Sequence, residues 1–84
     1  MYKLIIKSSA KKELDGISNE QFLKIDVAIL ALKTNPHPYP QSKKLKGEAN
    51  CRLRVGDYRV VYGVDEKGKS ITVFRVRHRK DVYR

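Results

Sequence analysis

Cysteine is nearly absent from this sequence, because Cys51 is the only one in 84 residues. A single thiol excludes an internal disulfide framework and a cysteine-rich zinc site, so a reducing cytosolic setting is expected. Apolar runs of about 18 residues, as a membrane helix needs, are absent too. The amino-terminal MYKLIIKSSAKK is too short and too charged for the apolar part of a signal peptide. These absences predict a cytoplasmic protein with no membrane contact.

Acidic residues are scarce as well. Asp and Glu number 9 against 19 Lys and Arg, which gives a net charge of +10 at pH 7. Taken alone, such an excess would suit any acidic partner, from nucleic acid to a membrane surface, and the absence of membrane contact expected above favours nucleic acid. The acids are dispersed, unlike the clustered carboxylates of a metal nuclease, and the five glycines are scattered singly, unlike a glycine-rich phosphate loop. We therefore expect neither a metal nor a cofactor.

The length predicts one domain spanning residues 1–84, because single domains usually run to about 100–150 residues. A hydrophobic fraction of 40% and an aromatic fraction of 8% are too high for a disordered basic tail. We therefore expect a small folded domain with a thin core, which a bound partner would help to stabilise.

Apolar spacing in the first half predicts a strand followed by two helices. Residues 2–7 alternate as a strand, residues 8–16 predict a short helix, and residues 18–35 predict a longer one. Ser18 and Gln21 resemble a capping box at the start of the longer helix. Its apolar stripe is expected to consist of Phe22, Ile25, Ile29 and Leu32. The three prolines of NPHPYP end it, since each disfavours helix at the preceding residue.

In the second half the period of the pattern changes to two. Three strands are predicted, at residues 51–55, 58–64 and 71–77. Gly56-Asp57 joins the first two, residues 65–70 join the last two, and the lysine-bearing segment 41–50 is expected to be a loop. The order β-α-α-β-β-β predicts an α+β fold with a three-stranded antiparallel meander. The helical pair would pack on one face of the sheet and leave the other face open to ligands.

The two kinds of cation occupy different halves of the chain. All seven arginines follow residue 50, whereas nine of the twelve lysines precede it. The guanidinium fork grips phosphate with two hydrogen bonds, whereas lysine is a flexible point charge. Strand alternation sends Arg52 and Arg54 to one face, and the same parity groups Arg75 with Arg77. We predict a phosphate-binding sheet, with a merely solubilising surface as the alternative.

The carboxyl-terminal RVRHRKDVYR adds groups that can transfer protons. RNA self-cleavage requires a deprotonated 2′-hydroxyl, a neutralised phosphate and a protonated leaving oxygen. The arginines suit the second task. His78, whose side-chain type exchanges protons near neutral pH, and Tyr83 suit the other two. The alternatives are a surface histidine and a terminal aromatic packed on the core.

The segments KKLKGEANCRLRVGDYRVVYGV and VFRVRHRKDVYR resemble the RelE/ParE superfamily of bacterial and archaeal toxins, and its RelE branch in particular. The resemblance covers essentially the whole chain. It implies the toxin of a type II toxin–antitoxin system, a ribosome-dependent endoribonuclease that cuts mRNA in the ribosomal A site. ParE-type inhibitors of DNA gyrase share part of this pattern, so gyrase inhibition without nuclease activity is the alternative.

The resemblance also implies roles by position. Arg59 and Arg79 would neutralise the scissile phosphate, and Tyr83 would stack on a base. The RelE prototype has lysines where this chain has Arg52 and Arg54, and arginine is a poor general base. Either His78 has the base role or catalysis relies mainly on charge stabilisation, and our hypothesis is that His78 acts as the base or acid. The expected catalytic residues are Arg54, Arg59, His78, Arg79 and Tyr83. The expected RNA-binding residues are Arg52, Arg75, Arg77, Lys80, Lys44 and Lys46.

Charge and resemblance both predict an antitoxin as a partner, beside ribosome and mRNA. A short protein with an acidic segment that folds on binding would cover the arginines, docking on the helix of residues 18–35 or on the open sheet face. The family also implies higher-order toxin–antitoxin complexes. A plain nucleic-acid-binding module is a third possibility, although no aromatic pair on neighbouring strand positions suits base stacking.

Overall fold

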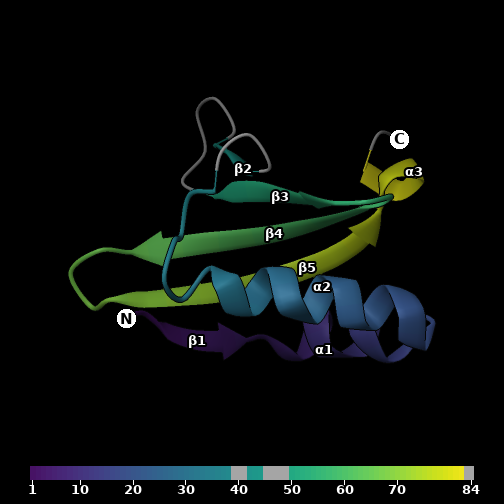
Figure 1. Ribbon diagram of the computed structural model, residues 1–84, viewed down its shortest axis with the longest axis horizontal. Helices are drawn as coiled ribbons and strands as arrows, with labels where there is room; N and C mark the ends of the chain where they lie inside the picture. Colours follow the sequence, from purple (N-terminus) through teal and green to yellow (C-terminus); the bar gives the residue numbers. More distant parts are fainter. Residues whose placement is uncertain (39–41, 45–49, 83–84) are drawn as a thin grey trace.

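The computed structural model describes residues 1–38, 42–44 and 50–82 (Figure 1). Within these ranges the strands are β1 (Lys3–Ile6), β2 (Ser42–Lys44), β3 (Cys51–Val55), β4 (Tyr58–Asp65) and β5 (Ser70–His78). The helices are α1 (Ser8–Asp15), α2 (Asn19–Ala31) and α3 (Arg79–Val82). The predicted α+β class is confirmed.

The strands form one sheet in the order β1-β5-β4-β3-β2. The predicted antiparallel meander is present as β3, β4 and β5, and β1 joins β5 in parallel. The expectation that residues 41–50 are a loop is wrong for Ser42–Lys44, which pair with β3 and give the sheet a fifth strand. This strand has no apolar alternation to reveal it. Its pairing depends on the backbone groups along the edge of β3, which any sequence can supply.

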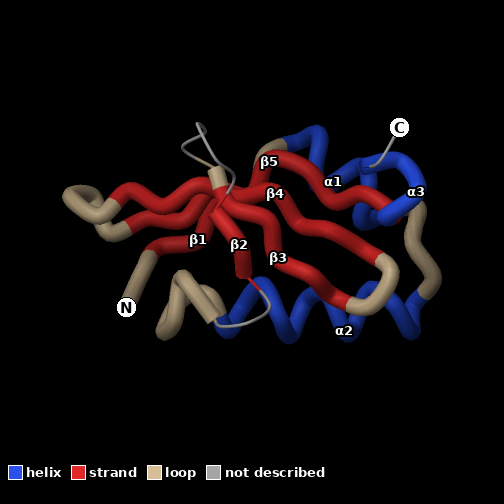
Figure 2. The backbone as a smooth tube through the Cα atoms, turned by 90° about the horizontal axis from the view of Figure 1, so that it is seen from above, coloured by secondary structure: helices blue, strands red, loops and turns tan. Residues whose placement is uncertain are grey.

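Helix α2 lies along one face of the sheet (Figure 2). The hydroxyl of Ser18 accepts a hydrogen bond from the backbone N–H of Gln21 at 3.5 Å, as the capping pattern predicted. Helix α2 ends at Ala31 instead of near Asn35. Thr34 donates its hydroxyl to the carbonyl of Ala31 at 3.1 Å, and the same oxygen accepts the backbone N–H groups of Thr34 and Asn35 at 3.2 and 3.1 Å.

Helix α1 packs along the edge of β5 that β1 leaves free. The hydroxyl of Ser9 donates to the carbonyl oxygen of Phe74 at 2.7 Å, and the carboxylate of Glu13 accepts the backbone N–H of Val76 at 2.8 Å. Two backbone groups of β5 that would otherwise lack a sheet partner are thereby satisfied. The helix thus closes one edge of the sheet at the level of the arginines.

The core lies between α2, α1 and the face of the sheet turned toward them. Its buried residues are Ala10, Leu14, Ile25, Ile29, Leu32, Cys51, Leu53, Val60, Tyr62, Ile71, Val73 and Val76. Of the predicted helical stripe, Ile25, Ile29 and Leu32 are fully buried and Phe22 is half-buried. Strand alternation places Leu53 and Val60 in this core, so their sequence neighbours Arg54 and Arg59 point to the other side of the sheet.

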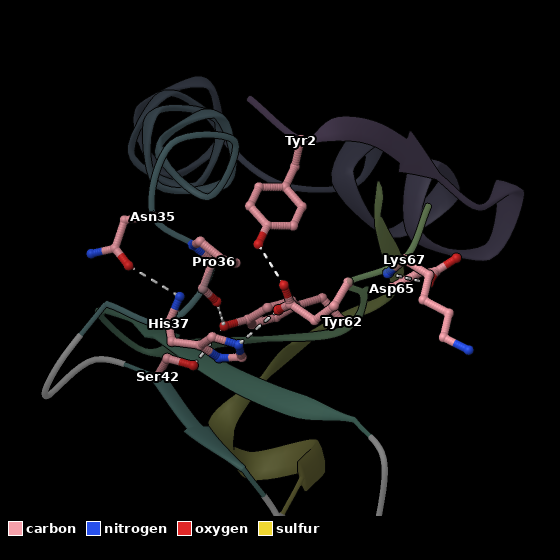
Figure 3. Close-up of polar contacts among 9 residues, drawn as sticks. Tyr2, Asn35, Pro36, His37, Ser42, Tyr62, Asp65 and Lys67 are labelled. Carbon is pink, nitrogen blue, oxygen red and sulfur yellow. Dashed lines mark hydrogen bonds and ion pairs between the residues drawn. The ribbon is translucent and has the colours of Figure 1, made fainter. Parts of the chain in front are cut away.

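Tyr62 is the largest fully buried side chain in this core. Its hydroxyl donates to the carbonyl oxygen of Pro36 at 2.6 Å and lies 2.6 Å from the hydroxyl oxygen of Ser42 (Figure 3). Burial raises the pKa of Tyr62 and the hydrogen bond with Ser42 lowers it. Burial is the larger effect, so the pKa is raised to about 12. One phenol therefore ties β4 to β2 and to the segment after α2.

Candidate nucleic-acid interface

Three arginines form a row across the open face of the sheet. Directly opposite residues of antiparallel strands share a face, and the register pairs Arg54 with Arg59 and Arg59 with Arg77. Such neighbours have Cβ atoms about 4.5–5.5 Å apart. We call Arg54, Arg59 and Arg77 the arginine row. It extends across β3, β4 and β5 on the face away from α2.

A second basic row lies two residues further along the strands. It consists of Arg52, Val61 and Arg75, and Lys43 of β2 lies opposite Arg52 on the same face. Arg52 is half-buried, and its Nε atom is buried without a hydrogen-bond partner among the described residues. The register thus brings Arg52 and Arg54 together with Arg75 and Arg77. An anion on this face meets guanidinium groups from three adjacent strands.

The turn between β3 and β4 positions Arg59. Gly56 has a φ of +57°, in the left-handed region that suits glycine, and lets two residues reverse the chain. The Nη1 atom of Arg59 donates to the carbonyl oxygens of Gly56 and Tyr58, at 3.1 and 2.9 Å. The backbone N–H of Arg79 donates to the carbonyl oxygen of Asp57 at 2.7 Å. The turn therefore holds one arginine of the row and anchors the start of α3.

One carboxylate from α1 contacts the arginines of β5. Glu13 accepts two hydrogen bonds from Arg75, and its Oε2 atom lies 3.8 Å from Nε of Arg77. Burial on its own would raise the pKa of Glu13. The hydrogen bonds from Arg75 and Val76 and the charges of both arginines outweigh burial, and the pKa is lowered. Glu13 is therefore ionised at neutral pH and orients the arginines along this edge.

His78 lies on the opposite face of the sheet from the arginine row. The register places it opposite Tyr58, and the two rings meet edge to face with centroids 5.3 Å apart. Its Nδ1 atom accepts the backbone N–H of Lys80 at 3.2 Å, so Nε2 is the nitrogen left for an external partner. Alternation along β5 turns Arg77 and His78 to opposite faces, so the sheet does not bring His78 into the arginine row.

The other predicted site residues are placed as follows. Arg79 and Lys80 are exposed in α3, beyond the end of β5. Lys44 is the last residue of β2, and its side chain is outside the described part of the structure. Lys46 and Tyr83 also lie outside the described residues.

The open face also carries a hollow that sequence reasoning missed. The register shifts between Val61 and Tyr62 of β4, which pair with Arg75 and Val73, so Phe74 is the unpaired residue of a β-bulge. An open hollow of about 230 Å³ is lined by Asn50, Gly63, Val64, Asp65, Thr72 and Phe74. The only signal in the sequence is Gly63, since an interior glycine often marks a bulge or a close approach.

Two further observations concern the described residues alone. No three His, Cys, Asp or Glu side chains in residues 1–38, 42–44 and 50–82 lie close enough together to hold a metal ion. None of the three helices in these ranges has the length and apolar character that crossing a membrane requires. Cys51 is a buried free thiol.

Comparison with protein families identifies the chain. A family model described as "ParE toxin of type II toxin-antitoxin system, parDE" matches residues 4–83. The chain belongs to this toxin family. The family forms part of the RelE/ParE superfamily, as the sequence motifs predicted, and the RelE-like character of the chain appears in its individual relatives.

Three relatives illustrate the likeness. Toxin RelE3 of Methanocaldococcus jannaschii is 48% identical over 42 residues, a match that covers 49% of this chain and 46% of that protein. The chain therefore aligns with about half the length of this curated relative. A chain of the archaeal RelE-RelB complex from Pyrococcus horikoshii matches with a TM-score of 0.84 and 28% identity, covering 93% of this chain and 94% of the other. The RelB-RelE antitoxin-toxin complex from Methanococcus jannaschii gives a TM-score of 0.75 and 27% identity, with 94% of each chain covered.

Proposed function

We propose that this RelE-like toxin is an endoribonuclease that cleaves mRNA in the ribosomal A site and so inhibits translation in the cytoplasm. The observation that supports this most is the arginine row, which gathers guanidinium groups from three strands on a face that α2 leaves open. Guanidinium groups bind phosphate with two hydrogen bonds and suit the charge that develops during phosphodiester cleavage.

In this mechanism Arg54, Arg59 and Arg79 bind the scissile phosphate and stabilise the pentavalent transition state at the end of the sheet where the β3–β4 turn meets α3, because the backbone N–H of Arg79 donates to Asp57 of that turn. Arg52, Arg75 and Lys43 bind the neighbouring phosphates of the same strand, because they lie on the same face one row away. Arg77, Lys44, Lys46 and Lys80 would contribute further contacts to RNA. The chemistry requires only charge stabilisation and proton transfer, so we propose that it proceeds without a metal.

Proton transfer is assigned to His78, with Tyr83 orienting a base. His78 is the last residue of β5 and its ring is half-buried, so it lies at the end of the sheet beside the exposed α3 residues Arg79 and Lys80. A scissile phosphate bound between Arg59 and Arg79 at this end lies between the two faces, where Nε2 of His78 reaches it. Because Nδ1 accepts the N–H of Lys80, the neutral ring carries its proton on Nε2 and donates it to the leaving oxygen. Accepting the 2′-hydroxyl proton at Nε2 instead requires the other tautomer and the loss of that hydrogen bond.

We also propose a cognate antitoxin as the partner of this chain. The similar archaeal structures are complexes of RelE with RelB. A net charge of +10 and an open arginine face suit an acidic segment that folds on binding, covers the arginine row and excludes RNA. Such pairs would assemble further into higher-order toxin–antitoxin complexes.

Inhibition of DNA gyrase is the second candidate, because the matching family model carries the name of ParE toxins. A gyrase inhibitor acts by protein contact and needs no proton-transfer group. The two functions therefore differ in what His78 and Tyr83 contribute.

The deciding experiment combines the purified protein with programmed ribosomes and maps mRNA ends, with a gyrase supercoiling assay in parallel. We expect cleavage within the A-site codon and unchanged supercoiling. The variant Arg59→Ala should lose cleavage. Lys24→Ala on α2, whose side chain lies 4.0 Å from Glu20, removes a charge away from the open face and serves as the matched control. Intact mRNA together with blocked supercoiling would establish gyrase inhibition instead.

A further inference from the structure

The hollow beside the second basic row differs from the arginine row in its lining, which contains no arginine or lysine among the described residues. A side chain at Gly63 would stand 3.2 Å from Cε2 of Phe74 and 3.2 Å from Oδ1 of Asn50. These contacts are closer than ordinary ones, so the Phe74 ring and the Asn50 amide pack over Gly63 as only a glycine allows, and both border the hollow. Thr72, opposite Gly63 on β5, completes this part of the face.

The chemistry of this lining suits a flat, uncharged group better than a phosphate. Phe74 offers an apolar ring and Asn50 offers an amide that both donates and accepts hydrogen bonds. Asp65 also lines the hollow, and its Oδ1 atom accepts the N–H groups of Lys67 and Gly68 at 3.2 and 3.1 Å. A carboxyl group, which offers acceptor oxygens and no positive charge, does not suit a phosphate. A nucleobase fits, because it stacks on aromatic rings and presents hydrogen-bonding edges.

The hollow lies in line with the two basic rows. Two residues of a strand advance about 6.8 Å, so Gly63 is about 7 Å along β4 from Val61 and about 14 Å from Arg59. A single RNA strand covers such a distance within a few nucleotides. Cationic side chains that follow the backbone, together with an aromatic ring under a base, are the usual combination for binding single strands.

We propose that this hollow is a nucleobase subsite, in which one base of the mRNA near the scissile phosphate stacks on Phe74 while Asn50 hydrogen-bonds its edge. The proposal rests on the endoribonuclease function and deepens it, because the subsite contributes to the choice of cleaved codon. An apolar antitoxin side chain is the competing occupant. The charge pattern favours RNA, since cationic rows lead up to the hollow.

The test measures cleavage of ribosome-bound mRNA by the intact toxin and by two variants at Phe74. Phe74→Leu removes the ring and should raise KM by about 5- to 150-fold, the range that corresponds to losing one stacked base. Phe74→Tyr keeps the ring and should recover most of this loss. An mRNA with an abasic nucleotide at the stacked position should raise the KM of the wild type by a similar factor. The same mRNA should not raise the KM of Phe74→Leu any further.

The outcomes separate this proposal from the function on which it rests. Absence of cleavage by the wild type overturns both. Cleavage by the wild type and by Phe74→Leu with equal KM overturns the nucleobase subsite alone. Additive effects of Phe74→Leu and the abasic nucleotide also overturn it, because they would place the base elsewhere. Normal cleavage by Phe74→Leu with lost neutralisation by the antitoxin assigns the hollow to the antitoxin. Equal melting temperatures of the three proteins exclude misfolding as the cause.

Discussion

Glu13 and Arg75 are joined by two parallel hydrogen bonds, Nε to Oε1 and Nη2 to Oε2, each 3.1 Å long. The same carboxylate accepts the backbone N–H of Val76 at 2.8 Å and approaches Nε of Arg77 at 3.8 Å. A single side chain of α1 thus binds the edge of β5 and directs two arginines of the open face. In the free protein, Glu13 partly neutralises a face that would otherwise carry only repelling cations.

The first prediction concerns Glu13→Gln, which keeps an acceptor for Val76 but removes the charge. The pKa of Glu13 is lowered in the fold, so its stabilising contribution is present above the ordinary pKa of 4.5 and is lost as pH falls through the folded value. We expect Glu13→Gln to unfold at lower urea concentration than the wild type at pH 7. The difference should shrink below about pH 4.

A suitable control for this comparison is Glu20→Gln, because Glu20 is exposed on α2 and its carboxylate lies 4.0 Å from Lys24. An exposed pair of this kind contributes little to stability. Should Glu13→Gln and Glu20→Gln show the same urea midpoints at pH 7, the contacts of Glu13 contribute nothing measurable.

The arginine row supplies the second prediction. Arg59→Ala removes a donor from the position of the scissile phosphate, and loss of one such donor should lower kcat by about 10²–10³-fold. Arg59→Lys keeps the charge but not the planar fork, so its rate should lie between the wild type and the alanine variant. Single-turnover cleavage on programmed ribosomes measures both. Equal rates for lysine and wild type would show that charge alone matters.

His78→Ala provides the third prediction. If His78 transfers a proton, its removal should slow cleavage by about 10²–10⁴-fold. The ring also packs against Tyr58, so thermal melting of the variant must accompany the kinetics. An unchanged cleavage rate in a folded His78→Ala protein would remove His78 from the mechanism.

The fourth prediction concerns Tyr62→Phe, which deletes the buried hydroxyl between Pro36 and Ser42. Each lost hydrogen bond should lower the free energy of unfolding by about 0.5–1.5 kcal/mol. The pKa of Tyr62 is raised to about 12, so folding keeps the phenol protonated where the unfolded chain ionises. The stabilisation is therefore complete below pH 10 and is lost as pH rises toward 12.

Urea unfolding of the wild type and Tyr62→Phe between pH 8 and pH 12 measures this difference. Other groups titrate in the same range and cancel in the comparison. The wild-type advantage should decline only above about pH 10. An advantage that is constant up to pH 12 would contradict the assigned environment of Tyr62.

Much of the fold could be predicted because its signals are local. The capping pair Ser18 and Gln21, the buried stripe of α2 and the alternation of β3 each depend on residues a few positions apart. Strand β2 and the parallel pairing of β1 with β5 could not be predicted in this way. Both depend on which backbone edges remain free after the meander has formed.

The candidate site likewise has a part that local sequence patterns predict and a part that depends on long-range pairing. Alternation alone showed that Arg52 and Arg54 leave the core. The same alternation turns Arg77 and His78 to opposite faces of the sheet. The sequence predicts this too once the strand expected at residues 71–77 is extended by one residue to His78. The bulge at Phe74 has no such local signature, because it arises from the register between β4 and β5.

The sequence by itself therefore determined that arginines occupy the outward positions of β3 and of the end of β5 on the open face. Only the tertiary structure decided how these groups are arranged. The register across the Gly56 turn aligned Arg54, Arg59 and Arg77 in one row, and the docking of α1 placed Glu13 against Arg75, 62 positions away in the chain. Side-chain alternation is a property of neighbouring residues, whereas register and docking result from long-range packing.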